Sequence, residues 1–242
     1  STRSGQYSQA IKYFTDSIDI SIETGTAKLE AMSLNNLGSI YCNLGHYSMA
    51  FDYCKHSLQI ARKIGDRQTE IESLIGIGDI HLELDEISDA EDLYKTALSI
   101  ARTLNSNSLL AEIYLCFTSL YLLKNDLPGI RDKLEQLMQL VDELDSRNLK
   151  ARAYCISGRF YLKKGILDIA KQNFDRSLAI FEESNRPFSI GQIHYYLGLM
   201  YIKLGNENTA INNLDNALRI FSELDAKGWT KKVEAARKKQ IN

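Results

Sequence analysis

The sequence predicts an all-α fold, a solenoid of antiparallel helix pairs, and two observations support this prediction. Every twentieth residue is Gly, Asn or Asp, the residue types that tolerate the left-handed backbone conformation in which many helices end. Two prolines in 242 residues leave the segments between these positions free to form helices. A fixed period along a chain is typical of repeat proteins, which normally present a surface. The predicted helix ends are Gly5, Gly25, Gly45, Gly65, Asp85, Asn105, Asn125, Asp145, Gly165, Asn185, Gly205 and Asp225.

The composition argues against several classes of protein. Hydrophobic residues make up 44% of the chain, but no stretch approaches the roughly 20 uninterrupted apolar residues of a membrane span. A formal net charge of −2 provides no positive field for a nucleic-acid backbone. The four cysteines show neither CxxC spacing nor the density of a disulfide scaffold, which indicates a reducing compartment. We expect a cytoplasmic chain with no membrane partner and no nucleic-acid partner.

Two kinds of helix alternate between the predicted ends, so the repeat unit is 40 residues long. The first kind, called A, carries apolar residues, a glycine and an aromatic residue at fixed spacing. The second kind, called B, carries two small residues seven positions apart, such as Ala50 and Ser57. Seven positions are two helical turns, so both small residues lie on one face and let another backbone approach closely. The A-helix glycine is expected to do the same.

This register divides residues 1–242 into a single solenoid. Residues 1–25 form a half repeat with a B helix only, and residues 226–242 form a C-terminal capping helix with Trp229 and Val233 packed on the last repeat. The five full repeats are 26–65, 66–105, 106–145, 146–185 and 186–225.

The repeat unit resembles the tetratricopeptide repeat over essentially the whole chain. Its pattern reads Leu34-x-x-Leu37-Gly38-x-x-Tyr41-x-x-x-Gly45-x-x-x-x-Ala50-x-x-x-x-x-x-Ser57 and is longer than the commonest version. This long form is similar to the repeats of Pins-type G-protein regulators, kinesin light chains, bacterial peptide-pheromone receptors and bacterial sensory regulators. The resemblance implies a right-handed superhelical α-solenoid whose A helices line a concave groove for a protein or peptide.

The first half repeat lacks an A helix to pack against its B helix. The apolar face of this B helix carries Tyr7, Ile11, Phe14 and Ile18, and each such side chain contributes roughly 1.5 to 3 kcal/mol when buried. We therefore expect either an upstream repeat in a longer parent protein or self-association through this helix.

The repeat at 106–145 departs from the pattern at three close contacts. Thr118 replaces the A-helix glycine, while Ile130 and Leu137 replace the two small B-helix residues. These bulkier groups are expected to widen the local helix pair. Neutral drift with compensating repacking and a change of superhelix curvature both remain as explanations.

The resemblance nominates the second, fifth and ninth A-helix positions, with their neighbours, as the groove surface. An amide suits the backbone of an extended peptide because it offers a donor and an acceptor together. Acidic residues follow in the middle of the array, then arginines, then tyrosines suited to anchoring a side chain. The plain alternative is that the charges only neutralise one another and the tyrosines only pack against the walls of the groove. The candidate groove residues are Asn35, Asn36, Asp79, Glu112, Arg152, Arg159, Tyr195 and Tyr196.

No motif for catalysis accompanies this surface. The four histidines are scattered, and HExxH, a nucleophile elbow and clustered Cys/His are absent, so we expect no enzyme activity, no metal and no cofactor. The sequence predicts a protein- or peptide-binding module, the regulatory or scaffolding arm of a larger signalling protein. Two alternatives stay open. One is a sensor of a short signalling peptide that controls an attached effector domain, and the other is a homo-oligomerisation element.

Overall fold

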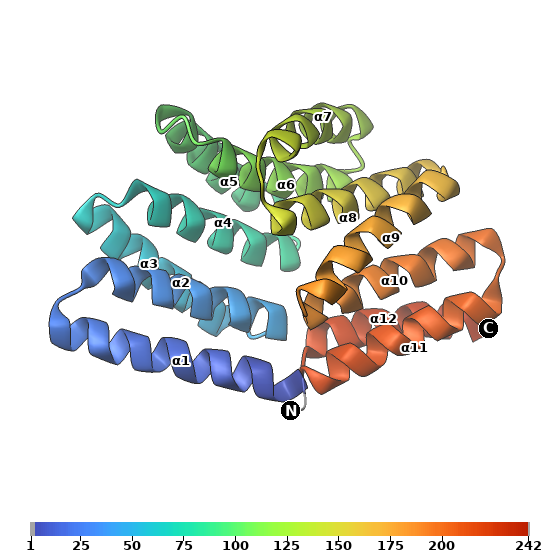
Figure 1. The fold of residues 1–242 in the computed structure, drawn as a ribbon, viewed down its shortest axis with the longest axis horizontal. Coiled ribbons are helices and arrows are strands. Elements are labelled where there is room, and N and C mark those ends of the chain that lie inside the picture. The colour runs from blue at the N-terminus through green and yellow to red at the C-terminus, as the bar shows by residue number, and fades with distance from the viewer. Residues whose placement is uncertain (1–2, 242) are drawn as a thin grey trace. The chain divides into compact units, whose positions relative to one another are not determined.

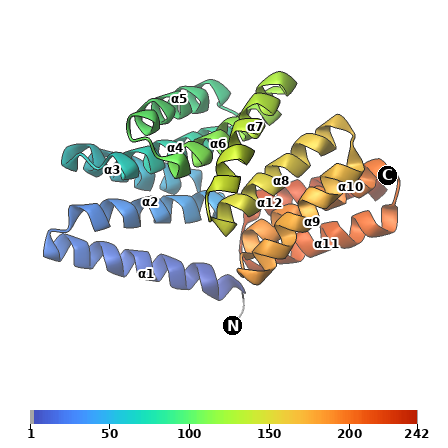
Figure 2. The same cartoon turned by 45° about the horizontal axis from the view of Figure 1, so that its top comes forward.

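A computed structural model describes residues 3–241 of the chain, with the side chains of residues 7–238, and within that range the structure is all-helical (Figure 1). Within residues 3–120 and within residues 121–241, consecutive helices run antiparallel, as both views of the ribbon show (Figures 1 and 2). The helices of the described range are α1 (Arg3–Thr24), α2 (Ala27–Leu44), α3 (Tyr47–Ile64), α4 (Arg67–Glu83), α5 (Ile87–Thr103), α6 (Asn107–Lys124), α7 (Leu127–Glu143), α8 (Arg147–Lys164), α9 (Leu167–Glu183), α10 (Pro187–Leu204), α11 (Glu207–Glu223) and α12 (Lys227–Ile241).

The chain forms two compact units, Ser1–Leu120 and Tyr121–Asn242. Each unit consists of A and B helices that alternate in sequence order and pack pairwise. None of the described helices is long and apolar enough to cross a membrane. The predicted all-α fold of antiparallel helix pairs is therefore confirmed.

Ten of the twelve predicted helix ends adopt the left-handed conformation. The five glycines among them have φ between +69° and +85°, and the five Asn and Asp residues have φ between +49° and +64°. The predictions for Gly5 and Asp145 are wrong. Gly5 lies inside α1, and the turn before α8 begins with an extended residue, Leu144, at φ −91° and ψ 125°. The side chain of Ser146 then caps α8 by accepting a hydrogen bond from the Leu149 backbone N–H.

The small residues of the two helix types bring A and B helices together. A Cβ added at Gly38 would lie 2.3 Å from the Cys54 sulfur, and one at Gly158 would lie 2.6 Å from the Phe174 ring. In the irregular repeat Thr118 is fully buried at the same position, and its hydroxyl donates to the Tyr114 carbonyl at 2.7 Å. Packing therefore explains the glycines inside the A helices.

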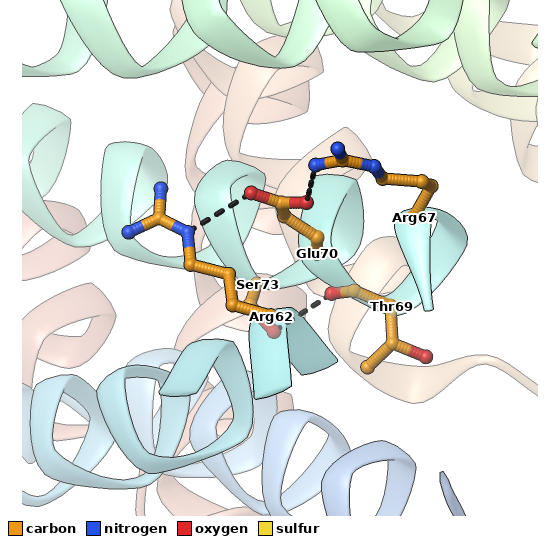
Figure 3. Close-up of polar contacts among 5 residues, drawn as sticks. All are labelled: Arg62, Arg67, Thr69, Glu70 and Ser73. Atoms are coloured by element: carbon orange, nitrogen blue, oxygen red, sulfur yellow. Dashed lines mark hydrogen bonds and ion pairs between the residues drawn. The ribbon is translucent and has the colours of Figure 1, made fainter. Parts of the chain in front are cut away.

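Two arginines pair with one buried carboxylate at the turn between α3 and α4. The Glu70 side chain is 5% exposed and accepts hydrogen bonds from Arg62 at 2.9 Å and Arg67 at 2.7 Å (Figure 3). Burial alone opposes the charge of Glu70, but the two guanidinium groups outweigh it and lower the pKa of this carboxyl.

The last helix closes the second unit by burying its apolar residues. Trp229, Val233 and Ala236 of α12 are buried, and Trp229 stacks on Phe221 of α11 with ring centroids 5.1 Å apart. Trp229 therefore packs on the last repeat, and Val233 is buried.

Candidate functional site

The first unit places an unsatisfied amide on the A-helix side. Asn35 of α2 is 9% exposed, and its Oδ1 has no hydrogen-bond partner among the described residues. This oxygen would lie 3.4 Å from a Cβ added at Gly76 of α4, so the amide faces a stretch of helix that has no side chain. Asn36, the next residue, is exposed.

Asp79 of α4 is held by the neighbouring B helix. Its carboxylate accepts a hydrogen bond from the Tyr94 hydroxyl of α5 at 2.6 Å. Burial, followed by the charge of Asp79, raises the pKa of Tyr94 well above its ordinary value. The half-buried carboxylate of Asp79 therefore has a structural partner as well as a place on the candidate surface.

Two half-buried glutamates at equivalent A-helix positions add negative charge to the first unit. These are Glu72 of α4 and Glu112 of α6. Burial raises the pKa of Glu72, and the nearby carboxylates of Asp66 and Glu112 raise it further against the hydrogen bond that Gln68 donates. The A-helix side of this unit is therefore acidic, and Glu72 takes up a proton more readily than an exposed carboxylate does.

The second unit carries positive charge on the same helix type. Arg152, Cys155 and Arg159 lie on one side of α8, and all three are half-buried. The guanidinium carbon of Arg159 lies 4.9 Å from the centroid of the Tyr196 ring on α10. Burial raises the pKa of the Cys155 thiol to about 11, even though the two arginines act in the opposite direction. This thiol is therefore not a nucleophile near neutral pH.

A chain of aromatic contacts runs from Tyr196, the ring under Arg159, to Trp229 in the C-terminal helix. Tyr196 stacks on Phe174 with centroids 6.0 Å apart, and its ring meets Tyr195 at 5.3 Å. Tyr195 in turn meets Trp229 edge to face at 5.7 Å. Sequence reasoning placed Trp229 only in the cap, although carrying the 40-residue register into α12 would have set it beside α10.

The structure thus gathers part of the predicted site. Arg159, Tyr195 and Tyr196 form one cluster in the second unit, with Trp229 as an added member. In the first unit Asn35 faces the backbone of Gly76, while Asp79 accepts a hydrogen bond from Tyr94. The two sets belong to separate units.

One group of side chains has the donor types of a metal site. Ligand atoms of His81, Glu86 and Asp89 lie within 4.8 Å of one another at the turn between α4 and α5. The His81 Nδ1 is already 2.6 Å from Glu86 Oε2, and both carboxylates are exposed at the start of α5. We assign these contacts to the turn, where carboxylates favour a helix N-terminus.

Comparison with sequence families gives two matches. Residues 29–103 match the family model described as tetratricopeptide repeat, and residues 161–227 match the model of anaphase-promoting complex subunit 5. No curated protein matches the chain.

Several solved structures share the fold. NprR in complex with its cognate peptide NprX has a TM-score of 0.74 at 16% identity, covering 99% of this chain and 74% of NprR. Rap protein complexed with competence and sporulation factor has a TM-score of 0.71 at 18% identity, covering 85% of this chain and 57% of Rap. BtubC (BKLC) from P. vanneervenii has a TM-score of 0.61 at 16% identity, covering 90% and 92%.

Proposed function

Residues 29–103 match the tetratricopeptide repeat family, and from this premise we propose that the A-helix face of the chain binds a peptide or an extended segment of a protein. We further propose that the chain serves as a regulatory or scaffolding arm of a larger signalling protein. A ligand of the first unit meets an acidic surface with the Asn35 amide, and a ligand of the second unit meets a cationic, aromatic surface.

One observation carries this proposal, namely the environment of Arg159. Among the residues whose side chains are described, no carboxylate pairs with this half-buried guanidinium, which instead lies over the Tyr196 ring. Stacking on the ring face leaves the N–H groups at the guanidinium edge free to form the two parallel hydrogen bonds that a carboxylate accepts. An acidic side chain of a ligand is the group that fits this edge.

Asn35 supports the same function in the first unit. A buried carbonyl without a donor costs about 1 to 3 kcal/mol. Exchanging the amide oxygen and nitrogen by rotation lets Asn35 either donate to or accept from a peptide backbone.

Two of the similar structures contain a bound peptide or factor, NprR with NprX and Rap with competence and sporulation factor. They favour a peptide as the ligand class. A second candidate function, a peptide sensor that controls an attached effector domain, is favoured by the description of NprR as a quorum sensor.

The experiment selects binders from a random peptide library displayed on phage and titrates them while following the fluorescence of Trp229, the single tryptophan. We expect the selected peptides to be enriched in Asp or Glu. Arg152→Glu together with Arg159→Glu should weaken their binding by about a hundredfold, because two attractive charges become repulsive. Helicity and melting temperature should stay nearly unchanged.

The matched control is Arg176→Glu on the B helix α9. Arg176 also stacks on a tyrosine, with its guanidinium carbon 5.6 Å from the Tyr154 ring centroid, but it is exposed on the other helix type. Its reversal should leave affinity unchanged. If the α8 double variant kept full affinity for the selected peptides, the assignment of the site would be lost.

A further inference from the structure

A glycine separates two carboxylates on the A-helix side of the first unit. Gly76 of α4 is half-buried, and Glu72 lies four positions before it and Asp79 three positions after it. Residues at these spacings share one face of a helix, and both carboxylates are half-buried as well. The other repeats carry a larger residue in place of this glycine. These residues are Asn36, Cys116, Ile156 and Tyr196.

The amide of Asn35 on α2 approaches α4 at this glycine. Its Oδ1 would lie 3.4 Å from a Cβ added at Gly76, and this buried oxygen has no hydrogen-bond partner among the described residues. The other repeats pack without an amide at the position of Asn35. Their residues are Ile75, Leu115, Cys155 and Tyr195. An acceptor that lacks a donor therefore lies on the face of α4 that carries the two carboxylates.

Asp79 brings negative charge close to this amide. Its Oδ1 accepts a hydrogen bond from the Tyr94 hydroxyl at 2.6 Å, which holds the carboxylate in place. The Cys54 sulfur would lie 2.9 Å from the same Cβ at Gly76. Burial, followed by the charge of Asp79, raises the pKa of this thiol to about 12. The field of Asp79 thus reaches the side chains that lie against Gly76.

Glu72 lies among other negative groups. Burial and the carboxylates of Asp66 and Glu112 raise its pKa. Lys28 acts in the opposite direction, but its ammonium lies 3.2 Å from the carboxylate of Asp66. A cation placed beside Glu72 would relieve this repulsion.

We propose that Asn35, Glu72 and Asp79, called here the acceptor cluster, bind a lysine or arginine side chain of the peptide, an inference that rests on the function proposed above. Carboxylates only accept hydrogen bonds, whereas ammonium and guanidinium groups only donate them, so a cation matches the cluster. The Asn35 oxygen is covered in the free chain, and rotation of the amide about its last bond presents it to the ligand.

The test begins with the full chain carrying Arg152→Gln and Arg159→Gln, which removes positive charge from the second unit without adding negative charge. Peptides selected with this variant from the random phage library should be enriched in Lys or Arg. No binders, or binders without this enrichment, would overturn the proposal. The acidic peptides selected by the unmodified chain depend on the two arginines, so the proposed function would still stand.

Three variants of the cluster, made in the same background, test its members. Glu72→Gln and Asp79→Asn each remove a charge and keep the shape, and each should weaken binding of the selected peptides at least about tenfold. Asn35→Leu should weaken it about threefold or more. The matched control is Glu23→Gln, since Glu23 is exposed on the B helix α1, and it should leave affinity unchanged. Equal effects of Glu72→Gln and Glu23→Gln, or full affinity of Asn35→Leu, would overturn the proposal.

A second set of peptides locates the cation. Norleucine in place of the enriched Lys, or citrulline in place of the enriched Arg, should weaken binding at least about tenfold when the cluster is intact. The same exchange should cost about twofold or less when Glu72→Gln and Asp79→Asn are combined. Equal costs in both backgrounds would place the cation elsewhere. Displacement of the peptide by about 1 mM calcium chloride, but not by sodium chloride of equal ionic strength, would assign the cluster to a metal ion and equally overturn the proposal.

Discussion

The guanidinium of Arg159 on α8 lies over the ring of Tyr196 on α10, with 4.9 Å between its central carbon and the ring centroid. Tyr196 is itself stacked on Phe174, whose ring is nearly parallel at 5°. The arginine is therefore positioned by a ring that the core already fixes. A charge held in this way loses less conformational freedom when it binds a ligand.

The role of this ring is tested by two substitutions of Tyr196. Tyr196→Phe keeps the ring face and should leave the affinity for the selected acidic peptides within about twofold. Tyr196→Leu removes the platform under Arg159 and should weaken binding about tenfold, with a loss of stability near 1 kcal/mol from the stack on Phe174. Titration and urea unfolding measure the two effects separately. Equal affinities of both variants would show that the stack does not position Arg159.

Asn35→Leu should separate binding from stability. The substitution removes a buried oxygen that has no donor, so the free energy of unfolding should rise by about 1 kcal/mol. Binding of peptides that contact the first unit should weaken, because the amide is lost. Urea unfolding of the free protein decides the first part. A clear drop in stability would mean that the amide is satisfied in solution.

Gly158 and Gly165 should tolerate alanine poorly for different reasons. A Cβ at Gly158 would meet the Phe174 ring at 2.6 Å, so Gly158→Ala should cost about 1 to 3 kcal/mol through overpacking. Gly165 has φ +77° and open space around it, so Gly165→Ala should cost about 1 kcal/mol through backbone strain. Adding Phe174→Leu should relieve part of the first cost and none of the second. Non-zero coupling at Gly165 in this double-mutant cycle would refute the distinction.

Glu70 and Glu72 should change the free energy of unfolding in opposite directions as the pH rises. The pKa of Glu70 is lowered in the folded state, so its contribution is present above the unfolded pKa, about 4.3, and is lost as the pH falls through the folded pKa. Glu70→Gln should cost about 1 kcal/mol at pH 7, a modest value because both arginines are largely exposed, and little at low pH.

Glu72 behaves in the opposite way because its folded pKa is raised. Its effect is most favourable at low pH, and stability falls as the pH rises from the unfolded pKa through the folded one. Glu72→Gln should therefore be neutral or stabilising at pH 7. Urea unfolding of both variants from pH 3 to pH 7 checks the pair. Parallel profiles would contradict both pKa shifts.

Much of the fold could be predicted because the residues that recur with the period each have a local physical role, which is to end a helix. The glycines at 25, 45, 65, 165 and 205 end helices through their positive φ, which depends on the residue itself. Gly5 and Asp145 carry the same signal, but α1 continues through Gly5, and Leu144 ends α7 by turning extended. Composition at one position does not determine the conformation of its neighbours.

The candidate site was less predictable because its character depends on contacts between helices. The sequence nominated Asp79 without showing that Tyr94 holds its carboxylate. It placed Arg159 and Tyr196 on successive A helices, but only the packing sets one over the other. Trp229 was missed as a neighbour of Tyr195 since it lies outside the repeats that defined the pattern.

The B-helix residue that faces the A-helix glycine differs from repeat to repeat within this single polypeptide. Opposite the A-helix glycine stands a thiol at Cys54, a phenol at Tyr94, a phenyl ring at Phe174 and a leucine at Leu214. Because these repeats share one period, exchanging whole repeats would change the core volume at this position without altering the period. The repeats therefore show the range of side-chain volumes that this packing position accepts, from Cys54 to Tyr94.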